Sequence, residues 1–360
     1  MAIFRVPALL ALPVAAALAL TLPSVQRVLL PPPETVQALT EQALDTPEPA
    51  PPVQHDVIYH RDLLRRYRLD VYGPLPSPTD GPSVSDATTD GGRGEVGSAA
   101  PVIVFFHGGS WLRGDKVTIR VIHRFLRRMR EEGWYVVAVN YTTSAYRGIR
   151  GPVRNAARSV TWVMNHADEY GWDPQRVGVY GVSAGGHVAL MAASTSRIAY
   201  PSGPPSPRPA LVLAECAPTD LQAMRRGDAF ENSGSFALFP PWRRRRLSPV
   251  EHVDDEFPPT LIYHGDGDHT VAFRQARVLN DALTGHRVPH TLVRYPGGGH
   301  AFLNYSDAQW YEQESRAIRW MRSVFDTGLP PDPPSPAPAT MPLYGGDEPG
   351  RAIRPEGSPL

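Results

Sequence analysis

The sequence predicts an α/β fold, in which helices cover both faces of a mainly parallel central sheet. Between residues 66 and 325, segments typical of strands alternate with segments whose apolar residues recur at helical spacing. Several strand-like segments are continuous apolar runs, as expected for strands that are buried on both faces of a parallel sheet. In such a fold the active site lies at the carboxyl ends of the strands, where the connecting loops gather.

The strands follow from these patterns in chain order. Arg66–Tyr72 alternates polar and apolar residues, which indicates a half-buried edge strand. Pro101–Phe106 (PVIVFF) and Tyr135–Tyr141 (YVVAVNY) are almost wholly apolar, which indicates strands in the interior of the sheet. Four further strands are predicted at Arg176–Val182, Ala210–Ala217, Pro259–His264 and His290–Tyr295.

Helices are predicted in the intervening segments and after the last strand. They are Thr118–Glu132, Val153–Tyr170, Ala184–Ser194, Phe273–Leu283 and Asp307–Phe325. In the first, Val121, Phe125 and Met129 recur at helical spacing, with arginines on the opposite side. The second places Ala156 and Val160 on one apolar stripe, the third is rich in small residues, and the last is amphipathic.

Composition excludes several classes of protein. The 360 residues include 36 Lys and Arg and 36 Asp and Glu, so the formal net charge is zero. This balance argues against a protein whose main role is to bind nucleic-acid phosphates. A hydrophobic content of 42% is sufficient for a large core. The single cysteine, Cys216, excludes a disulfide framework and a thiolate metal cage within the chain.

The N-terminal segment is typical of an exported protein. An uncharged apolar run extends from Val6 to Leu22, after Arg5, with the small residues Ala17 and Ala19 near its end. Residues 1–30 are therefore predicted to be a signal peptide or a membrane anchor, so that the protein is secreted or associated with a membrane. A cytosolic protein with an unusual N-terminus is the remaining alternative.

The 40 prolines are concentrated in segments that flank or interrupt the predicted fold. Residues 31–53 are predicted to be a proline-rich spacer and residues 329–360 a disordered tail, which leaves residues 54–328 as the folded domain. Within this domain, Gly73–Ala100 and Arg197–Pro209 resemble surface insertions.

A G-x-S-x-G motif, GVSAG at residues 181–185, directly follows a predicted strand and opens an apolar helix. A strand, a sharp turn and a helix form the context in which this motif carries a nucleophilic serine. Gly181 and Gly185 would give the room that so tight a turn needs. We therefore expect the hydroxyl group of Ser183 to project above the edge of the sheet, near the positive end of the following helix.

A second turn, HGGSW at residues 107–111, follows the strand PVIVFF. Glycines at this point would let the backbone expose N–H groups to a bound carbonyl oxygen. An oxyanion hole needs two such donors. We expect one donor from the loop Gly108, Gly109 and Ser110, and the other from the N–H of Ala184.

HGGSW followed by GVSAGGH resembles the α/β-hydrolase fold, and more narrowly the carboxylesterases related to hormone-sensitive lipase and the bacterial acetyl- and feruloyl-esterase-like group. The resemblance extends from about Val57 to about Phe325 and includes LDVYGP and EYGWDPQRVGVYG. It implies a mainly parallel sheet, a small lid insertion and no cofactor. Ser110 stands where many relatives have glycine or alanine, so Gly109 and Ser110 remain alternatives for the loop donor.

The resemblance also implies an acid and then a histidine base after Ser183 in the chain. The imidazole would accept the serine proton, and the carboxylate would fix its tautomer. Relatives have H-G-x-x-D at the corresponding strand end, which matches HGDGD at residues 264–268 and assigns Asp268. Asp266 is the alternative, and its expected role is to brace the turn. The base assigned in this way is His300, in the glycine-rich loop after the last strand.

Two weaker signals lie between the predicted strand Ala210–Ala217 and the acid. Phe230, Phe236, Phe239 and Trp242 lie where this fold places lids, and either a lid or ordinary packing would explain them. Arg243–Arg246 would meet an acidic substrate or anionic lipid headgroups, or form a solvated basic surface. No spacing suggests a zinc site, and no phosphate-binding glycine loop is present in the sequence.

The expected function is a serine carboxylic-ester hydrolase that acts on short or medium acyl esters, with residues 54–328 as its catalytic domain. Small-molecule esters are its expected partners, without nucleic acid. An amide hydrolase, such as an arylformamidase or an exopeptidase, is an alternative because it would use the same triad. A non-catalytic binding module is a second alternative, against which the presence of Ser183, Asp268 and His300 argues.

Overall fold

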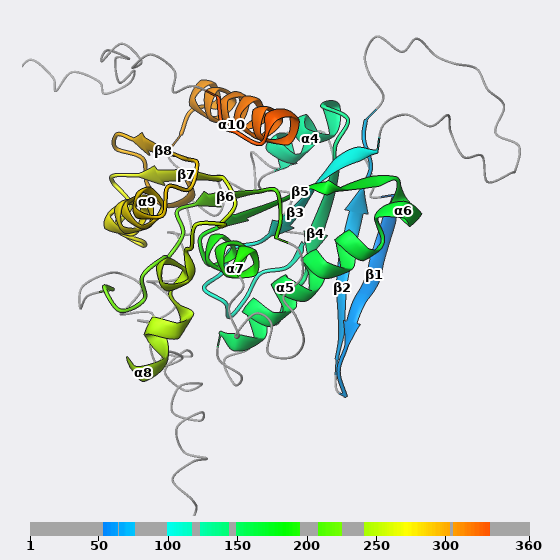
Figure 1. The fold of residues 1–360 in the computed structure, drawn as a ribbon, viewed down its shortest axis with the longest axis horizontal. Coiled ribbons are helices and arrows are strands. Elements are labelled where there is room, and N and C mark those ends of the chain that lie inside the picture. Colours follow the sequence, from blue (N-terminus) through cyan, green and yellow to red (C-terminus); the bar gives the residue numbers. More distant parts are fainter. Residues whose placement is uncertain are drawn as a thin grey trace, which may run out of the picture.

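The computed structural model describes residues 53–63, 65–75, 99–116, 123–143, 149–194, 208–224, 241–302 and 305–331. Its centre is an eight-stranded sheet with the order β1-β2-β4-β3-β5-β6-β7-β8 (Figure 1). The strands are β1 Gln54–Arg61, β2 Arg66–Tyr72, β3 Ala100–Phe106, β4 Tyr135–Val139, β5 Trp172–Val182, β6 Leu211–Glu215, β7 Thr260–Gly265 and β8 His290–Tyr295.

Strand direction confirms the predicted sheet type. The strands from β4 to β8 in this order are parallel to their neighbours, whereas β2 pairs antiparallel with both β1 and β4. The interior strands are buried along nearly their whole length, as their continuous apolar sequences predicted. The carboxyl ends of the parallel strands consequently meet at one edge of the sheet.

Helices cover both faces of the sheet. They are α4 His123–Glu131, α5 Arg150–Asn165, α6 Ala167–Tyr170, α7 Ala184–Ala193, α8 Pro241–Arg244, α9 Arg274–Gly285 and α10 Asp307–Thr327. Figure 1 shows α5, α7 and α9 on one side of the sheet and α4 and α10 on the other. Successive side chains of a strand point to opposite faces of the sheet, so each face has its own apolar cluster. Each cluster is buried between the sheet and the helices on that side.

Several predicted boundaries differ from the structure. The strand β1 was not predicted, and β4 ends at Val139 instead of Tyr141. The helix predicted over Val153–Tyr170 is two helices, because the chain breaks at His166, whose φ and ψ of −108° and 16° are not helical. The beginning of the helix predicted over Thr118–Glu132 lies outside the described residues.

Other predictions fall on residues that the structure does not describe. These are the signal peptide or anchor, most of the spacer and tail, most of both surface insertions, the lid residues Phe230, Phe236 and Phe239, and the side chain of Trp242. Within the described part of the chain, no helix combines the length and the apolar character that crossing a membrane requires. Export and membrane association therefore stay predictions.

Candidate active site

Ser183 lies at the carboxyl edge of the sheet, in the turn between β5 and α7. Its φ of 57° and ψ of −122° are an unusual conformation for a non-glycine residue, and such strain is found where a side chain is held for a function. The turn is tight. A Cβ atom at Gly181 would lie 2.2 Å from the carbonyl oxygen of Gly185, and a Cβ atom at Gly185 would lie 2.0 Å from that of Phe106. Gly181 therefore lets the turn close tightly, and Gly185 lets it lie against the end of β3.

We predict that Gly185→Ala will destabilise the fold by roughly 3 kcal/mol, because its methyl group would overlap backbone atoms that cannot move independently. Chemical denaturation of the purified variant measures this loss. Gly285→Ala is the matched control, since a Cβ atom at Gly285 would meet nothing within 4 Å. Equal stability of the two variants would contradict the close packing of the serine turn on β3.

Three predicted residues from distant parts of the sequence meet at this edge. The Nε2 atom of His300 lies 2.9 Å from the Oγ atom of Ser183, and its Nδ1 atom lies 2.7 Å from the Oδ2 atom of Asp268. A carboxylate only accepts hydrogen bonds, so Nδ1 carries the proton and Nε2 is left to accept from the serine hydroxyl. Gly265 allows this meeting, because a Cβ atom there would lie 2.0 Å from the carbonyl oxygen of Gly298, in the loop that carries His300.

The environment of Asp268 favours its charged form. Burial alone would raise the pKa of Asp268, but hydrogen bonds from His264 and His300 and from the N–H of Val271 hold that pKa well below its ordinary value. The Oδ1 atom accepts from the N–H groups of Thr270 and Val271, both at 2.8 Å. His264 was not predicted to act here. Its Nε2 atom donates to the carbonyl oxygen of Val271 at 2.7 Å and lies 3.4 Å from Oδ2 of Asp268.

Asp266, the competing carboxylate, has a different set of partners. Its Oδ2 atom accepts from Arg294 at 2.6 Å, and its Oδ1 atom accepts from the N–H of Gly297 at 2.6 Å. It thereby braces the turn that leads to His300, as the sequence predicted, while Asp268 alone contacts the imidazole.

The predicted oxyanion loop lies beside Ser183. A Cβ atom at Gly108 would be 3.6 Å from that of Ser183. Gly109 and Ser110 both have positive φ angles, of 115° and 56°, so the backbone turns sharply at the end of β3. Ala184 is the first residue of α7, and the first N–H groups of a helix have no partner within it. The structure thus brings both predicted sources of N–H donors to the same place as the nucleophile.

Two residues within the motifs, for which no role was predicted, stabilise this arrangement. The indole N–H of Trp111 donates to Nδ1 of His187 at 3.2 Å, and Nε2 of His187 donates to the carbonyl oxygen of Leu247 at 2.7 Å. Burial lowers the pKa of His187 to about 4, so its ring is neutral and Nδ1 can accept a hydrogen bond from the indole N–H. The pair ties the oxyanion loop, α7 and the segment after α8 together. The sequence signal for this pair is that Trp111 and His187 are the last residues of the glycine motifs HGGSW and GVSAGGH.

A buried acid also adjoins the site. The carbonyl oxygen of Glu215 accepts from the N–H of Ser183 at 2.8 Å, and its side chain accepts from the hydroxyl of Tyr180 at 2.9 Å. Burial raises the pKa of Glu215 to about 7, although the Tyr180 hydrogen bond and the charge of His300 act in the opposite direction. The folded protein therefore holds a proton on Glu215 at pH values where the unfolded chain releases it.

We expect Glu215→Gln to remove a loss of stability that wild type shows between acidic and neutral pH. Wild-type stability should fall as pH rises from about 4.5 to about 7, because the folded state binds the extra proton over this range. The free energy of unfolding of the variant minus that of wild type should therefore be about 3 kcal/mol larger at pH 8 than at pH 4. Urea denaturation at both pH values measures it, with the exposed Glu131→Gln as control. A difference that is independent of pH would contradict a buried, protonated Glu215.

The residues present do not make a convincing metal site. Among the described residues, Cys216, His264 and Asp268 are the group whose ligand atoms lie within 4.8 Å of one another. Burial raises the pKa of the Cys216 thiol well above its ordinary value, which disfavours the thiolate that binds metals. Asp268 already interacts with both His264 and His300.

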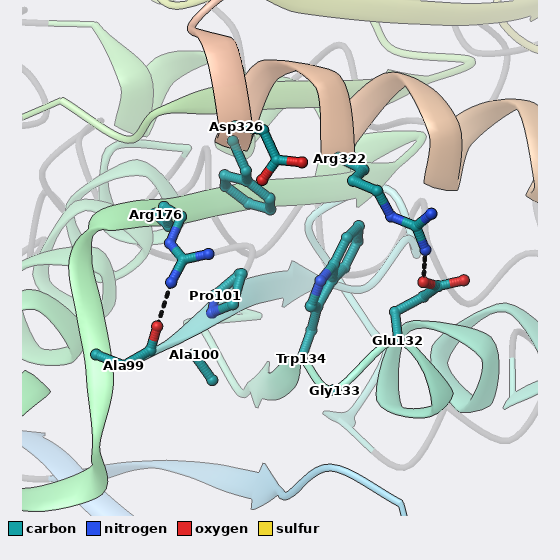
Figure 2. Close-up of a pocket in the computed structure, with 10 residues that line it drawn as sticks. Ala99, Ala100, Pro101, Glu132, Gly133, Trp134, Arg176, Arg322 and Asp326 are labelled. Carbon is teal, nitrogen blue, oxygen red and sulfur yellow. Dashed lines mark hydrogen bonds and ion pairs between the residues drawn. The ribbon is translucent and has the colours of Figure 1, made fainter. Parts of the chain in front are cut away.

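A cavity of about 310 Å³ lies at the opposite edge of the sheet, at the amino ends of β3 and β5 (Figure 2). Its charged lining is largely paired: Arg322 with Glu132 and, outside the cavity, Arg176 with Asp173. Because the strands run parallel, this cavity is separated from Ser183 by the length of the sheet, and it contributes nothing to the candidate site.

Sequence comparison places this geometry in a known group. The BD-FAE family model matches residues 94–283, which is more than half of the chain and includes Ser183 and Asp268. The chain belongs to the BD-FAE family. Its α/β-hydrolase fold, inferred above from HGGSW and GVSAGGH, is confirmed by similar solved structures of esterases. The apo form of Thermogutta terrifontis esterase 2 aligns with a TM-score of 0.61 and 23% identity, over 79% of this chain and 98% of that one.

Curated relatives of this BD-FAE protein come from bacteria and plants. The probable carboxylic ester hydrolase LipM of Mycobacterium tuberculosis is 28% identical and aligns over 68% of this chain and 59% of its own length. Esterase LipC of the same organism is 26% identical over 71% of this chain and 64% of its own. The isoprenylcysteine alpha-carbonyl methylesterase ICME of Arabidopsis thaliana is 26% identical over 67% of this chain and 55% of its own. The alignments span about three fifths of these relatives.

Proposed function

We propose that this protein is a serine carboxylic-ester hydrolase. The observation that carries the proposal is the hydrogen-bonded chain from Ser183 through His300 to Asp268, with distances of 2.9 and 2.7 Å. A serine hydroxyl becomes a useful nucleophile only when an adjacent base removes its proton, and this chain provides that base and the group that orients it. The relatives named as esterases support the same activity.

The proposed reaction has two halves. The Oγ atom of Ser183 attacks the ester carbonyl carbon while its proton passes to Nε2 of His300, and the buried charge of Asp268 stabilises the imidazolium. The tetrahedral intermediate collapses when the imidazolium gives that proton to the leaving alcohol, which leaves an acyl group on Ser183. Water then loses a proton to His300, attacks the acyl carbon, and releases the acid and free Ser183.

The negative charge of both intermediates needs fixed donors. We assign these to the N–H of Ala184 and the N–H of Gly109 or Ser110, in the loop that begins at Gly108. Trp111 and His187 hold the loop against α7, so the donors would not have to reorganise during the reaction. A donor of this kind contributes about 10²- to 10³-fold to turnover.

Short or medium acyl esters are the proposed substrates, because the chain between β6 and β7 leaves only a modest insertion for a lid. Amide hydrolysis passes through the same oxyanion, so the triad does not separate the two reactions. We favour esters because the relatives LipM, LipC and ICME are each named as ester hydrolases.

Hydrolysis of p-nitrophenyl esters of increasing acyl length, in parallel with matched p-nitroanilides, tests the proposal. We expect turnover of the esters to exceed that of the anilides, and a fluorophosphonate probe to label the protein at Ser183. The absence of both ester turnover and labelling would refute the proposed function and would instead favour a binding module.

A further inference from the structure

Four arginines gather near the candidate site although they come from two separate segments. Arg150 and Arg154 lie one helical turn apart at the start of α5, whereas Arg243 and Arg246 lie in α8 and the 3₁₀ turn after it. We call these four residues the arginine cluster. Burial and the positive charges of Arg243, Arg154 and Arg246 lower the pKa of Arg150, so these three guanidinium groups lie near enough to act on Arg150.

The arginine cluster has no countercharge in the described part of the chain. The neighbouring Arg245 does, since its Nε atom bonds to Glu251 at 2.8 Å. None of the four cluster residues forms such an ion pair with a described residue. The Nε atom of Arg154 is in addition buried without a hydrogen-bond acceptor among these residues. Since a buried, unpaired N–H on a cation is costly, a ligand group that accepts a hydrogen bond from this atom would be favoured.

The half of the cluster that follows α8 is tied to the nucleophile helix. His187 lies one helical turn after Ser183 and donates to the carbonyl oxygen of Leu247 at 2.7 Å. Arg246 directly precedes Leu247 in the chain. The backbone next to Arg246 is therefore attached to α7 at a residue one helical turn after the nucleophile.

The half of the cluster on α5 is tied to the oxyanion loop. Gly151, directly after Arg150, packs on Thr142, since a Cβ atom at Gly151 would lie 3.4 Å from the Thr142 side chain. The adjacent Tyr141 donates from its hydroxyl to the carbonyl oxygen of His107 at 2.6 Å. Helix α5 also packs along α7 on the same side of the sheet (Figure 1). Both halves of the arginine cluster are thus attached to segments that pack on α7.

We propose that the arginine cluster binds an anionic group of the substrate, so that the enzyme prefers esters that carry a carboxylate or phosphate away from the ester bond. This inference rests on the proposed ester hydrolysis. Guanidinium groups match both anions in geometry through paired N–H donors. A group of charges of the same sign also raises the local concentration of oppositely charged substrates, and added salt weakens this effect.

Two pairs of probes test the proposal. In one pair, p-nitrophenyl valerate and the p-nitrophenyl monoester of glutaric acid differ by an acyl-side carboxylate. In the other, phenyl butyrate and 4-carboxyphenyl butyrate differ on the alcohol side. We expect wild type to prefer the anionic member of at least one pair. The double variant Arg150→Gln/Arg246→Gln should lower its kcat/KM for that member about tenfold, at low salt, and leave the neutral member unchanged.

The control is Arg287→Gln/Arg319→Gln, which removes the same charge from exposed positions on other elements. It should leave the preference intact. Equal losses for the neutral and anionic esters in the cluster variant, or no preference in wild type, would overturn the proposal. If no ester is hydrolysed at all, the proposed function fails instead. Turnover of the neutral esters by wild type therefore separates the two failures.

Discussion

Replacing Ser183 with alanine is expected to reduce ester turnover by roughly 10⁴- to 10⁶-fold, the range expected when the nucleophile of such a triad is lost. Alanine removes the hydroxyl group that His300 would activate for attack on the ester, because Nε2 of the imidazole lies 2.9 Å from the serine oxygen. The residual rate would come from the oxyanion donors and from binding alone. Steady-state hydrolysis of a p-nitrophenyl ester by the purified variant measures the loss.

A second readout separates lost chemistry from lost structure. Ser183→Ala should unfold at the same denaturant concentration as wild type or higher, because alanine keeps the Cβ atom and removes only a half-buried hydroxyl. It should also lose all labelling by a fluorophosphonate. Ser323→Ala, on α10, is the matched control and should behave as wild type in both assays. Turnover by Ser183→Ala within tenfold of wild type would mean that another residue is the nucleophile.

Much of the site was predictable because each of its parts carries a local sequence signal. The strand-turn-helix context of Ser183, the turn after β3 and the glycine loop before His300 each need residues of a particular size at particular positions. The structure explains these needs as contacts between backbones, for example that of Gly185 with Phe106. Because such contacts tolerate no side chain, their glycines are visible in a single sequence.

The parts that were not predicted depend on contacts between distant segments. The strand β1 lacks regular alternation, and its pairing with β2 is interrupted by register shifts between Gln54 and Val57 and between Ile58 and His60. The role of His187 depends on Leu247, and the arginine cluster depends on the approach of α8 to α5. A motif cannot encode such partners, since they are brought together only when the sheet and its helices have packed.

The carboxylate that orients His300 gives the second large expected effect. Asp268→Asn should lower kcat/KM about 10⁴-fold, the loss expected when a triad carboxylate becomes an amide. Oδ1 of Asp268 accepts two backbone N–H groups, so the oxygen of an asparagine must take that position. Its NH₂ group would then face Nδ1 of His300, which would have to accept and so would move its proton to Nε2. In that tautomer Nε2 can no longer take the proton of Ser183.

Asp266→Asn is the matched control, two residues away and with the same change of charge. Asp266 binds Arg294 and the N–H of Gly297, and it has no contact with the imidazole, so the variant should keep activity within about tenfold of wild type. Both variants are compared with wild type by ester turnover and by the rate of fluorophosphonate labelling, which requires an activated serine. A larger loss for Asp266→Asn than for Asp268→Asn would reverse the assignment. Because Nδ1 of His300 lies 2.7 Å from Oδ2 of Asp268, the tautomer argument applies to this carboxylate and not to its neighbour.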